Sequence, residues 1–176
     1  MQTKSKSDTD IHSRRIIVAG GSGFIGSRLI RRLTADINRH APQSKTEIVC
    51  LTRDPDSIKN IFDKNIKLVK ADVSNYQDLA NAMSDGGIDI AYYLVHSMEG
   101  TTKEWKKFSE RDRVAAMNFA RAASEHRVKR IIYLGGLVHA EDNNNNNDRI
   151  SQHMQSRKEV GEILQRHSTS KVTIFR

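Results

Sequence analysis

The sequence is short of cysteine and of long hydrophobic runs. Cys50 is the only cysteine among 176 residues, which excludes a disulfide framework and a cysteine-rich metal site, and no metal site is expected. No apolar run approaches the ~20 residues that a membrane-spanning helix needs. Residues 1–13 lack both the apolar core of a secretory signal and the arginines of a transit peptide, so we expect a disordered tail and a cytoplasmic protein.

Acidic residues are too few to balance the basic ones. Lys and Arg contribute 29 positive charges against 21 negative charges from Asp and Glu, which gives a formal net charge of +8. Such a surface attracts polyanions, including nucleic acid, anionic lipid and phosphorylated small molecules. The sequence contains no zinc-finger spacing, RNA-binding strand signature or compact basic arm, so it gives no specific nucleic-acid signal. A solvated helix face explains the excess more simply.

Apolar runs that predict strands alternate with amphipathic segments that predict helices. Near-continuous apolar strands are typical of a sheet buried on both faces, so residues 14–176 are predicted to form an α/β, doubly wound parallel sheet of the Rossmann type. The expected strand order is 3-2-1-4-5-6 with helices on both faces, and the asparagine-rich stretch 141–149 is expected to be a loop. The strands are expected at residues 15–20, 47–52, 66–71, 88–95, 128–134 and 172–175. The helices are expected at residues 25–37, 56–62, 104–126 and 151–167, with a further one that Ser74 and Gln77 begin as a capping box.

The strongest functional signal is the glycine-rich segment AGGSGFIGSRLI at residues 19–30, where the first strand leads into the first helix. Gly20 permits a tight turn, Gly23 lets the backbone approach a pyrophosphate, and Gly26 lets the helix pack close to the strand. The helix N-terminus adds free amides and a partial positive charge. This pattern predicts a dinucleotide site, and a plain strand-to-helix turn is the alternative. The residues expected to line the pyrophosphate are Gly20, Ser22, Gly23, Phe24, Ile25 and Gly26.

The end of the second strand favours NADP(H) over NAD(H), and the end of the third strand is expected at the adenine. Cofactors without a 2′-phosphate usually meet an acidic residue at the end of the second strand, but this chain has Thr52 followed by Arg53. A guanidinium binds a 2′-phosphate through two hydrogen bonds, and the alternative is a solvated arginine beside Asp54. Asp72 and Val73 follow the third strand and are expected to meet the adenine, with a simple helix-capping role for Asp72 as the alternative.

The end of the fourth strand supplies the ribose side of the predicted site. Ligands of open α/β sheets bind outside the carboxyl ends of the strands, which places Leu94, Val95 and His96 in contact with the cofactor. His96 can act there as an acid, a base or a hydrogen-bonding group, and a structural histidine is the alternative.

Several segments together resemble the short-chain dehydrogenase/reductase superfamily. They are VAGGSGFIG, LTRDP, ADVSN, AYYLVHSM and KRIIYLGGL, in this order, followed by SRKEVGEIL on the last helix. The sequence is most similar to the atypical, extended-type branch of NAD(P)H-binding, epimerase/dehydratase-like proteins. The resemblance covers about residues 14–176, and members of this branch continue well past that position. The C-terminal substrate-binding portion is therefore expected to be absent.

The resemblance implies a catalytic set of tyrosine, lysine, serine and asparagine that this chain replaces. The tyrosine and lysine positions are His153 and Arg157, the serine position falls in Gly135-Gly136, and the asparagine position is Asp112. Arginine holds a ribose hydroxyl but does not relay protons, whereas histidine titrates near neutral pH. Asp112 lies in the apolar stripe of its helix, so its carboxylate needs a partner. The candidate catalytic residues are His153, Arg157, Asp112 and His96, with Arg157 also expected at the nicotinamide ribose.

Two functional hypotheses follow from these expectations. The first is an NADP(H)-dependent oxidoreductase or epimerase-like enzyme with non-standard acid and base residues, acting on an unidentified small-molecule substrate. The second is a non-enzymatic NADP(H)-binding sensor, regulator or assembly module, which the replaced catalytic residues favour. A sheet without a continuation after its sixth strand leaves apolar surface exposed, so association into a homo-oligomer is also predicted.

Overall fold

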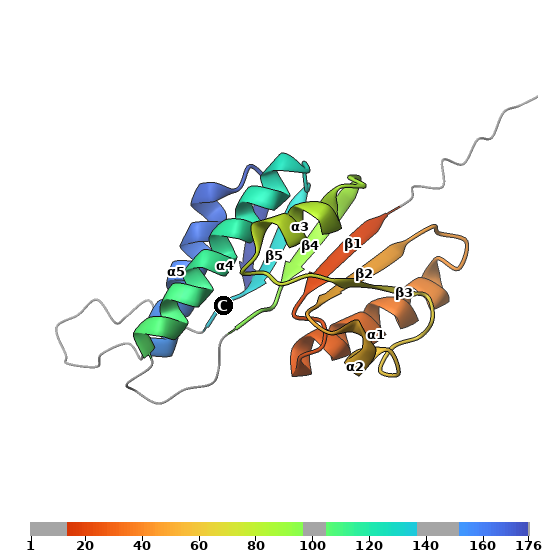
Figure 1. Cartoon of the computed structure of the whole chain (residues 1–176). Helices are drawn as coiled ribbons and strands as arrows, with labels where there is room; N and C mark the ends of the chain where they lie inside the picture. The colour runs from red at the N-terminus through yellow and green to blue at the C-terminus, as the bar shows by residue number, and fades with distance from the viewer. Residues whose placement is uncertain (1–13, 97–104, 137–151, 176) are drawn as a thin grey trace, which may run out of the picture.

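The computed structural model describes residues 14–96, 105–136 and 152–175, so the predicted tail 1–13 and the asparagine-rich stretch 141–149 lie outside the described residues. Six parallel strands form a sheet in the order β3-β2-β1-β4-β5-β6, which confirms the predicted fold class and strand order (Figure 1). The strands are β1 (Arg15–Ala19), β2 (Glu47–Thr52), β3 (Ile66–Lys70), β4 (Ile88–Tyr93), β5 (Arg130–Leu134) and β6 (Lys171–Phe175). The helices are α1 (Phe24–His40), α2 (Pro55–Ile58), α3 (Tyr76–Met83), α4 (Trp105–Glu125) and α5 (Gln152–His167).

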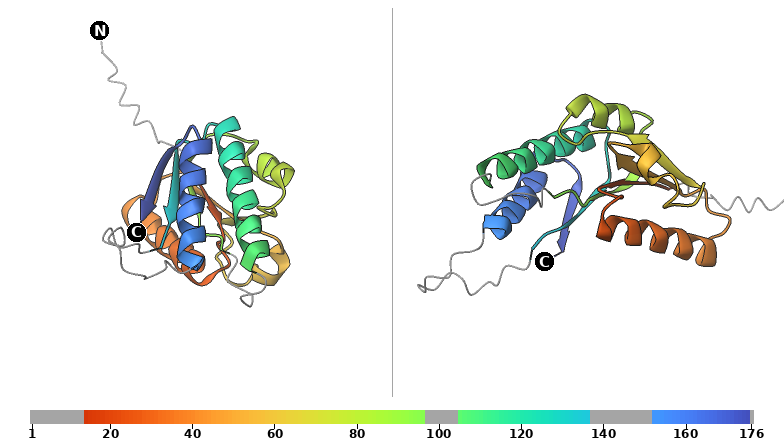
Figure 2. Two further views of the ribbon diagram at one scale, coloured as in Figure 1. Left: turned by 90° about the vertical axis from the view of Figure 1, so that its left-hand side faces the viewer. Right: turned by 60° about the horizontal axis from the view of Figure 1, so that its bottom comes forward.

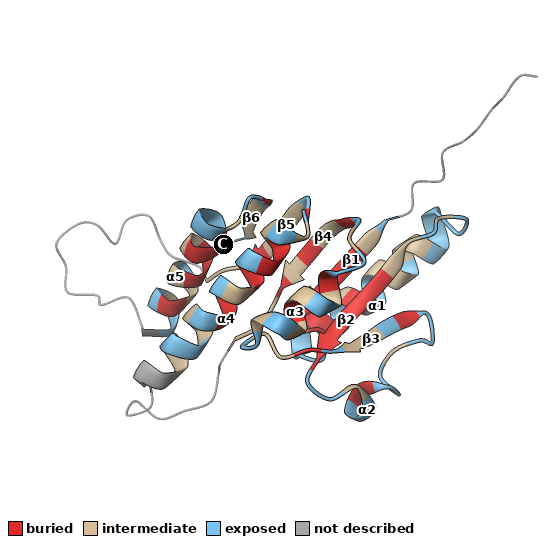
Figure 3. Ribbon diagram, turned by 45° about the horizontal axis from the view of Figure 1, so that its top comes forward, coloured by how far each residue is buried: buried red, intermediate tan, exposed pale blue. Residues whose placement is uncertain are grey.

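Helices cover the sheet from two sides (Figure 2). On one face, apolar residues of α3, α4 and α5 form the larger core with every second residue of the strands, including Ile17 of β1 and Tyr93 of β4. On the other face, α1 and α2 enclose a smaller core around Ile16, Val18 and Cys50. Burial is most complete along the neighbouring inner strands β1 and β2 (Figure 3). Their continuous apolar sequences are explained by this burial from both sides.

The predicted start of α3 and the predicted length of α2 differ from the structure. The Ser74 hydroxyl donates to Asp72 Oδ1, so Ser74 belongs to the preceding turn, and Asn75 caps α3 by accepting from the amide of Gln77. The helix expected at residues 56–62 is the four-residue α2, which begins at Pro55 and ends at Ile58. The Asp54 side chain caps it, and proline is well suited to the first helical position.

The fifth strand begins later than predicted, at Arg130 instead of residue 128. The amide of Val128 donates to the carbonyl of Ala123 across the end of α4, at 2.8 Å, and Arg127 has a positive φ of 53°. This arrangement closes the C-terminus of α4 in the way that a Schellman motif does. Residues 126–128 are therefore used to end the helix. The fourth strand is also shorter than the predicted 88–95, because it ends at Tyr93.

Strand β6 forms one edge of the sheet, and its last described residue, Phe175, is 56% exposed. Self-association through this edge and a cytoplasmic location stay predictions. Among the described helices, none combines the length and the apolar character needed to cross a membrane.

Ion pairs join the strands at the amino edge of the sheet. Arg15 of β1 pairs with Glu47 and Asp85, and Lys67 of β3 pairs with the same two carboxylates. Hydrogen bonding from Arg15 lowers the pKa of Glu47 and that of Asp85 below their ordinary values. Carboxylates with a lowered pKa stabilise the fold above the pKa of the unfolded chain, and this stabilisation is lost as the pH falls.

We therefore expect the free energy of unfolding to decrease between about pH 5 and pH 3, in part because Glu47 is protonated more easily in the unfolded chain. Glu47→Gln should cost about 0.5 kcal/mol at pH 7, since the pair is partly exposed, and should flatten the decrease at low pH. Urea unfolding of both proteins at pH 7 and pH 4 measures the effect. Asp63→Asn, an exposed carboxylate on the loop before β3, is the control, and an equal effect there would contradict the prediction.

Candidate functional site

The glycine-rich turn has the close backbone contacts that its sequence predicts. Gly20 has a positive φ of 84°, and the Gly23 amide donates to the Gly20 carbonyl at 3.2 Å. A Cβ added to Gly26 would lie 2.2 Å from the Gly20 oxygen, so only glycine fits there. A Cβ on Gly20 would lie 2.7 Å from the Leu94 oxygen, which brings the end of β4 against the turn.

The N-terminus of α1 is left open toward solvent. Gly23 is its N-cap, no side chain caps it, and its first turn contains no acidic residue. Phe24 and Ile25 are 73% and 49% exposed, and Ser22 is exposed as well. The free amides and the positive end of the helix dipole therefore face an accessible space, which suits an anion such as a pyrophosphate.

At the end of β2, Arg53 is exposed and its neighbours are occupied with local structure. The Thr52 hydroxyl accepts from the amide of Asp54 at 3.2 Å. The Asp54 carboxylate, the alternative partner for Arg53, accepts from the amides of Asp56 and Ser57 and caps α2. Within the described residues, the exposed guanidinium of Arg53 forms no ion pair with the Asp54 carboxylate, which caps α2.

The segment after β3 lies close enough to Arg53 for their charges to interact. Asp72 Oδ1 accepts from the amide and hydroxyl of Ser74, at 2.8 and 2.6 Å. These hydrogen bonds, with a smaller contribution from the charge of Arg53, lower the pKa of Asp72. Val73 is half-buried and packs against the larger core. Asp72 thus shapes the turn before α3 and also lies beside the basic end of β2.

The residues that follow β4 are half-buried beside the glycine turn. The Leu94 amide donates to the Ala19 carbonyl at 2.9 Å, which holds the end of β4 against β1. The ring of His96 lies 6.1 Å from that of Tyr133 on β5. Burial, together with the positive charge of Arg157, lowers the pKa of His96 to about 4. His96 is therefore a neutral imidazole at pH 7.

A hydrogen bond to its backbone carbonyl holds Arg157 of α5 close to Tyr133 and His96. The Tyr133 hydroxyl donates to the Arg157 carbonyl at 3.1 Å, and the Arg157 side chain reaches Gly136. A Cβ on Gly136 would lie 2.6 Å from Met154 Sδ, so a larger residue needs this side chain to move. The structure thus brings together His96, Tyr133 and Arg157, with glycine where the resemblance implies a serine.

Asp112 and His153, the two remaining candidate residues, have different surroundings. Asp112 is half-buried on α4, and the Ser156 hydroxyl donates to its Oδ2 at 3.4 Å. A buried serine of α5 is therefore one partner of this carboxylate. His153 lies in the first turn of α5 with an exposed side chain.

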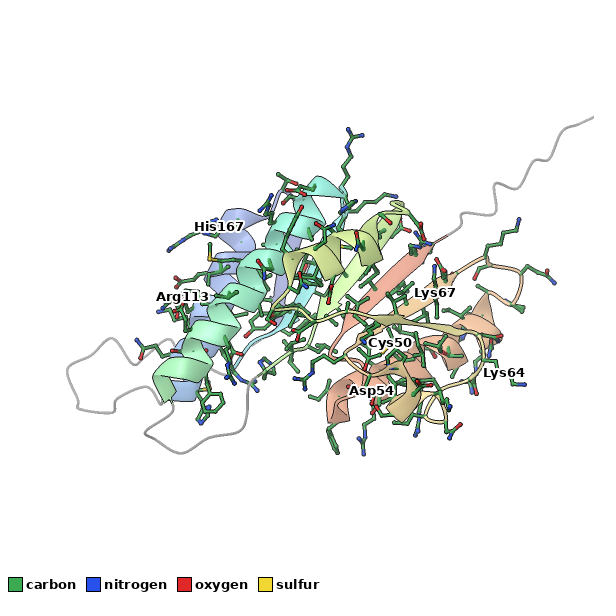
Figure 4. All side chains as sticks on the ribbon, in the orientation of Figure 1. Cys50, Asp54, Lys64, Lys67, Arg113 and His167 are labelled. Carbon is green, nitrogen blue, oxygen red and sulfur yellow. The ribbon has the colours of Figure 1, made fainter. Side chains whose placement is uncertain are left out.

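Sequence reasoning missed several residues that shape this edge of the sheet. Gly21 is buried, and a Cβ added there would lie 2.4 Å from the Sγ atom of Cys50 on β2 (Figure 4). Asn118 of α4 donates to the backbone after β3, and Ser156 pairs with Asp112. Gly21 could have been recognised from the run of glycines, but no local pattern marks the two polar contacts between distant segments.

The donor set of this edge is suited to a phosphate-bearing ligand. Arg53, Arg157 and the α1 amides supply positive charge, and the glycine cradle admits a close backbone approach. In the parts of the chain that the structure describes, no three His, Cys, Asp or Glu side chains gather in a way that could hold a metal ion.

Comparison with known proteins matches residues 20–176 to the family described as NAD(P)H-binding. The auxiliary protein GraX of Staphylococcus aureus is 30% identical over 124 residues, which cover 69% of this chain and 36% of GraX. A dTDP-D-glucose 4,6-dehydratase of Dictyostelium discoideum is 26% identical over 156 residues, which cover 81% of this chain and 35% of the dehydratase.

Among solved structures, the enzyme WbmH of Bordetella bronchiseptica in complex with NAD+ has a TM-score of 0.71 at 16% identity. The similarity covers 94% of this chain and 56% of WbmH, and it shows the same fold. The chain spans about a third of the length of the curated relatives and about half of the length of this structure. The match over residues 20–176 shows that the chain belongs to the NAD(P)H-binding family, as the resemblance to atypical short-chain dehydrogenases/reductases implied.

Proposed function

We propose that this chain binds NADP(H), in preference to NAD(H), across the carboxyl ends of β1 to β5. The observation that carries the preference is the exposed guanidinium of Arg53 at the end of β2, where its neighbour Asp54 is engaged as a helix cap. Arginine binds a 2′-phosphate with paired, charge-assisted hydrogen bonds, and a carboxylate in this place would repel it.

The proposed cofactor extends along the carboxyl edge of the sheet, from the adenine at the end of β3 to the nicotinamide ribose near α5. The pyrophosphate lies over the open N-terminus of α1, where no acidic residue opposes it. Asp72 and Val73 meet the adenine, Leu94, Val95 and His96 lie on the ribose side, and Arg157 binds the nicotinamide ribose. The pyrophosphate contacts come from Gly20, Ser22, Gly23, Phe24, Ile25 and Gly26.

When bound, the nicotinamide supplies hydride transfer, which oxidoreductases and epimerases both use. Around it, Arg157 supplies a fixed positive charge and His96 a neutral imidazole that can accept or donate a hydrogen bond. The substrate of such an enzyme is an unidentified small molecule. A dehydratase that acts on a nucleotide sugar is among the relatives, and this supports a carbonyl or sugar-type substrate.

A non-enzymatic NADP(H)-binding sensor, regulator or assembly module is the second candidate. Met154 packs against Gly136, which belongs to the glycine pair where the resemblance implies a serine, so this position supplies no hydroxyl. Arginine at the lysine position does not relay protons. The relative named as an auxiliary protein is consistent with such a role.

Turnover separates the two candidates. NADPH oxidation is measured with a panel of quinones, aldehydes and keto-sugars, using wild type and His96→Gln. A rate above background that the substitution abolishes supports the enzyme. NADPH binding without any turnover by a folded chain supports the binding module.

For the cofactor itself, we expect calorimetric titration to give a lower Kd for NADPH than for NADH. Arg53→Ala should weaken NADPH binding by roughly 10- to 100-fold, because it removes the charge-assisted bonds to the 2′-phosphate, and should leave NADH binding nearly unchanged. Arg39→Ala removes an equal charge at the far, exposed end of α1 and is the control. Equal losses for both nucleotides, or for both variants, would refute the proposed NADP(H) preference.

For His96, an NMR titration of the imidazole Cε1–H should have its midpoint at about pH 4. Since an unfolded chain takes up this proton near pH 6.5, His96 makes the fold less stable as the pH falls from 6.5 toward 4. Arg157→Ala should raise the pKa, because the positive charge is removed while the burial remains. Lys158→Ala, an exposed neighbour on α5, should not change it. A midpoint near 6.5 in wild type would be incompatible with a buried, neutral His96.

A further inference from the structure

The segment between β3 and α3 is held by a side chain that lies far away in the sequence. Asn118 of α4 is half-buried, and its Nδ2 donates to the Ser74 carbonyl at 2.8 Å and to the Val73 carbonyl at 3.4 Å. Helix α3 packs against α4, so the tether joins two neighbouring elements (Figure 1). One amide group thereby fixes two consecutive peptide units.

The orientation of the Asp72 carboxylate depends on this same backbone. Its Oδ1 accepts from the amide and the hydroxyl of Ser74, and the Asp72 amide donates to Asp78 Oδ2 at 3.0 Å. Within the described residues, no hydrogen bond engages Asp72 Oδ2. A change in the backbone at Val73 and Ser74 therefore changes the direction in which Oδ2 is presented.

We propose that Asn118 is a positioning residue that sets Asp72 and Val73 for recognition of the adenine. This inference rests on the proposed function, in which the adenine lies at the end of β3. Asn118 touches neither the nucleotide nor the reacting atoms. It acts by holding two carbonyl groups in place, so that the carboxylate acceptor is already oriented before the nucleotide binds.

A purely structural tether is the competing explanation, and the same helix provides a matched control. Ser124 lies on α4 as well, and its Oγ accepts from the amide of Thr169 at 2.9 Å, which holds the loop before β6. Asn118→Ala and Ser124→Ala each remove a polar contact between α4 and a distant loop. Only the first lies next to the proposed adenine position.

The test compares NADPH with its hypoxanthine analogue, in which a carbonyl replaces the adenine amino group. Asp72 accepts from the amino group but not from this carbonyl, so wild type should bind NADPH roughly tenfold more tightly than the analogue. Asn118→Ala should weaken NADPH binding by about 3- to 10-fold and reduce this preference toward one, because a misdirected carboxylate loses its contact. Ser124→Ala should keep the full preference for NADPH, even if its unfolding temperature falls as far as that of Asn118→Ala.

The outcomes separate this inference from the function on which it rests. A folded Asn118→Ala protein with an unchanged preference overturns the role of Asn118. If this variant does not fold, Asn118→Asp replaces it in the test, because this substitution keeps the side-chain volume but removes the donor. Asn118→Asp must then lose the preference for NADPH. If it retains the preference, the role of Asn118 is overturned. A wild type that binds NADPH and the analogue equally overturns the assignment of Asp72 and this inference, while NADP(H) binding stands. A wild type that binds neither nucleotide overturns the proposed function as well.

Discussion

The close approach of Gly26 to Gly20 is the constraint on which the carboxyl edge of the sheet depends. A side chain on Gly26 would collide with the Gly20 carbonyl, so α1 would have to move away from the end of β1. The same displacement would separate Ile30 of α1 from Gly21 and from Cys50, its neighbour in the smaller core. The position of the free α1 amides and the packing of that core are therefore set by one contact between backbones.

Polar contacts then fix three of the described segments along this edge, each by a separate route. Thr52 holds the turn after β2, Asn118 holds the segment after β3, and Tyr133 holds the start of α5 through the Arg157 carbonyl. Two of these contacts join elements far apart in the chain. A binding surface whose loops are fixed before the ligand arrives loses less conformational entropy on binding, so these contacts favour affinity without touching the ligand.

The sheet could be predicted from the sequence because burial on both faces leaves a visible pattern of continuous apolar strands, and β1 and β2 show it most clearly. The glycine turn could also be predicted from the sequence, because close backbone contacts at Gly20 and Gly26 exclude side chains and therefore leave glycines in the pattern. The cap of α3 was not, because Ser74 and Asn75 are both good caps and only the bond from Ser74 to Asp72 decides between them. The contact between Asp112 and Ser156 was also hidden, since nothing local indicates which polar residues of α4 and α5 will face each other.

The electrostatics around His96 limit what chemistry this edge can perform. Burial and the nearby Arg157 both oppose a positive charge on the imidazole, which is why its pKa lies far below neutrality. A base of this kind accepts a proton from a hydroxyl poorly, because the imidazolium would form next to a guanidinium in a half-buried place. Catalysis through His96 therefore requires a negative charge from the bound nucleotide or the substrate to compensate Arg157. In the proposed site, holding a ribose through hydrogen bonds requires no such compensation, because a neutral imidazole already donates and accepts hydrogen bonds.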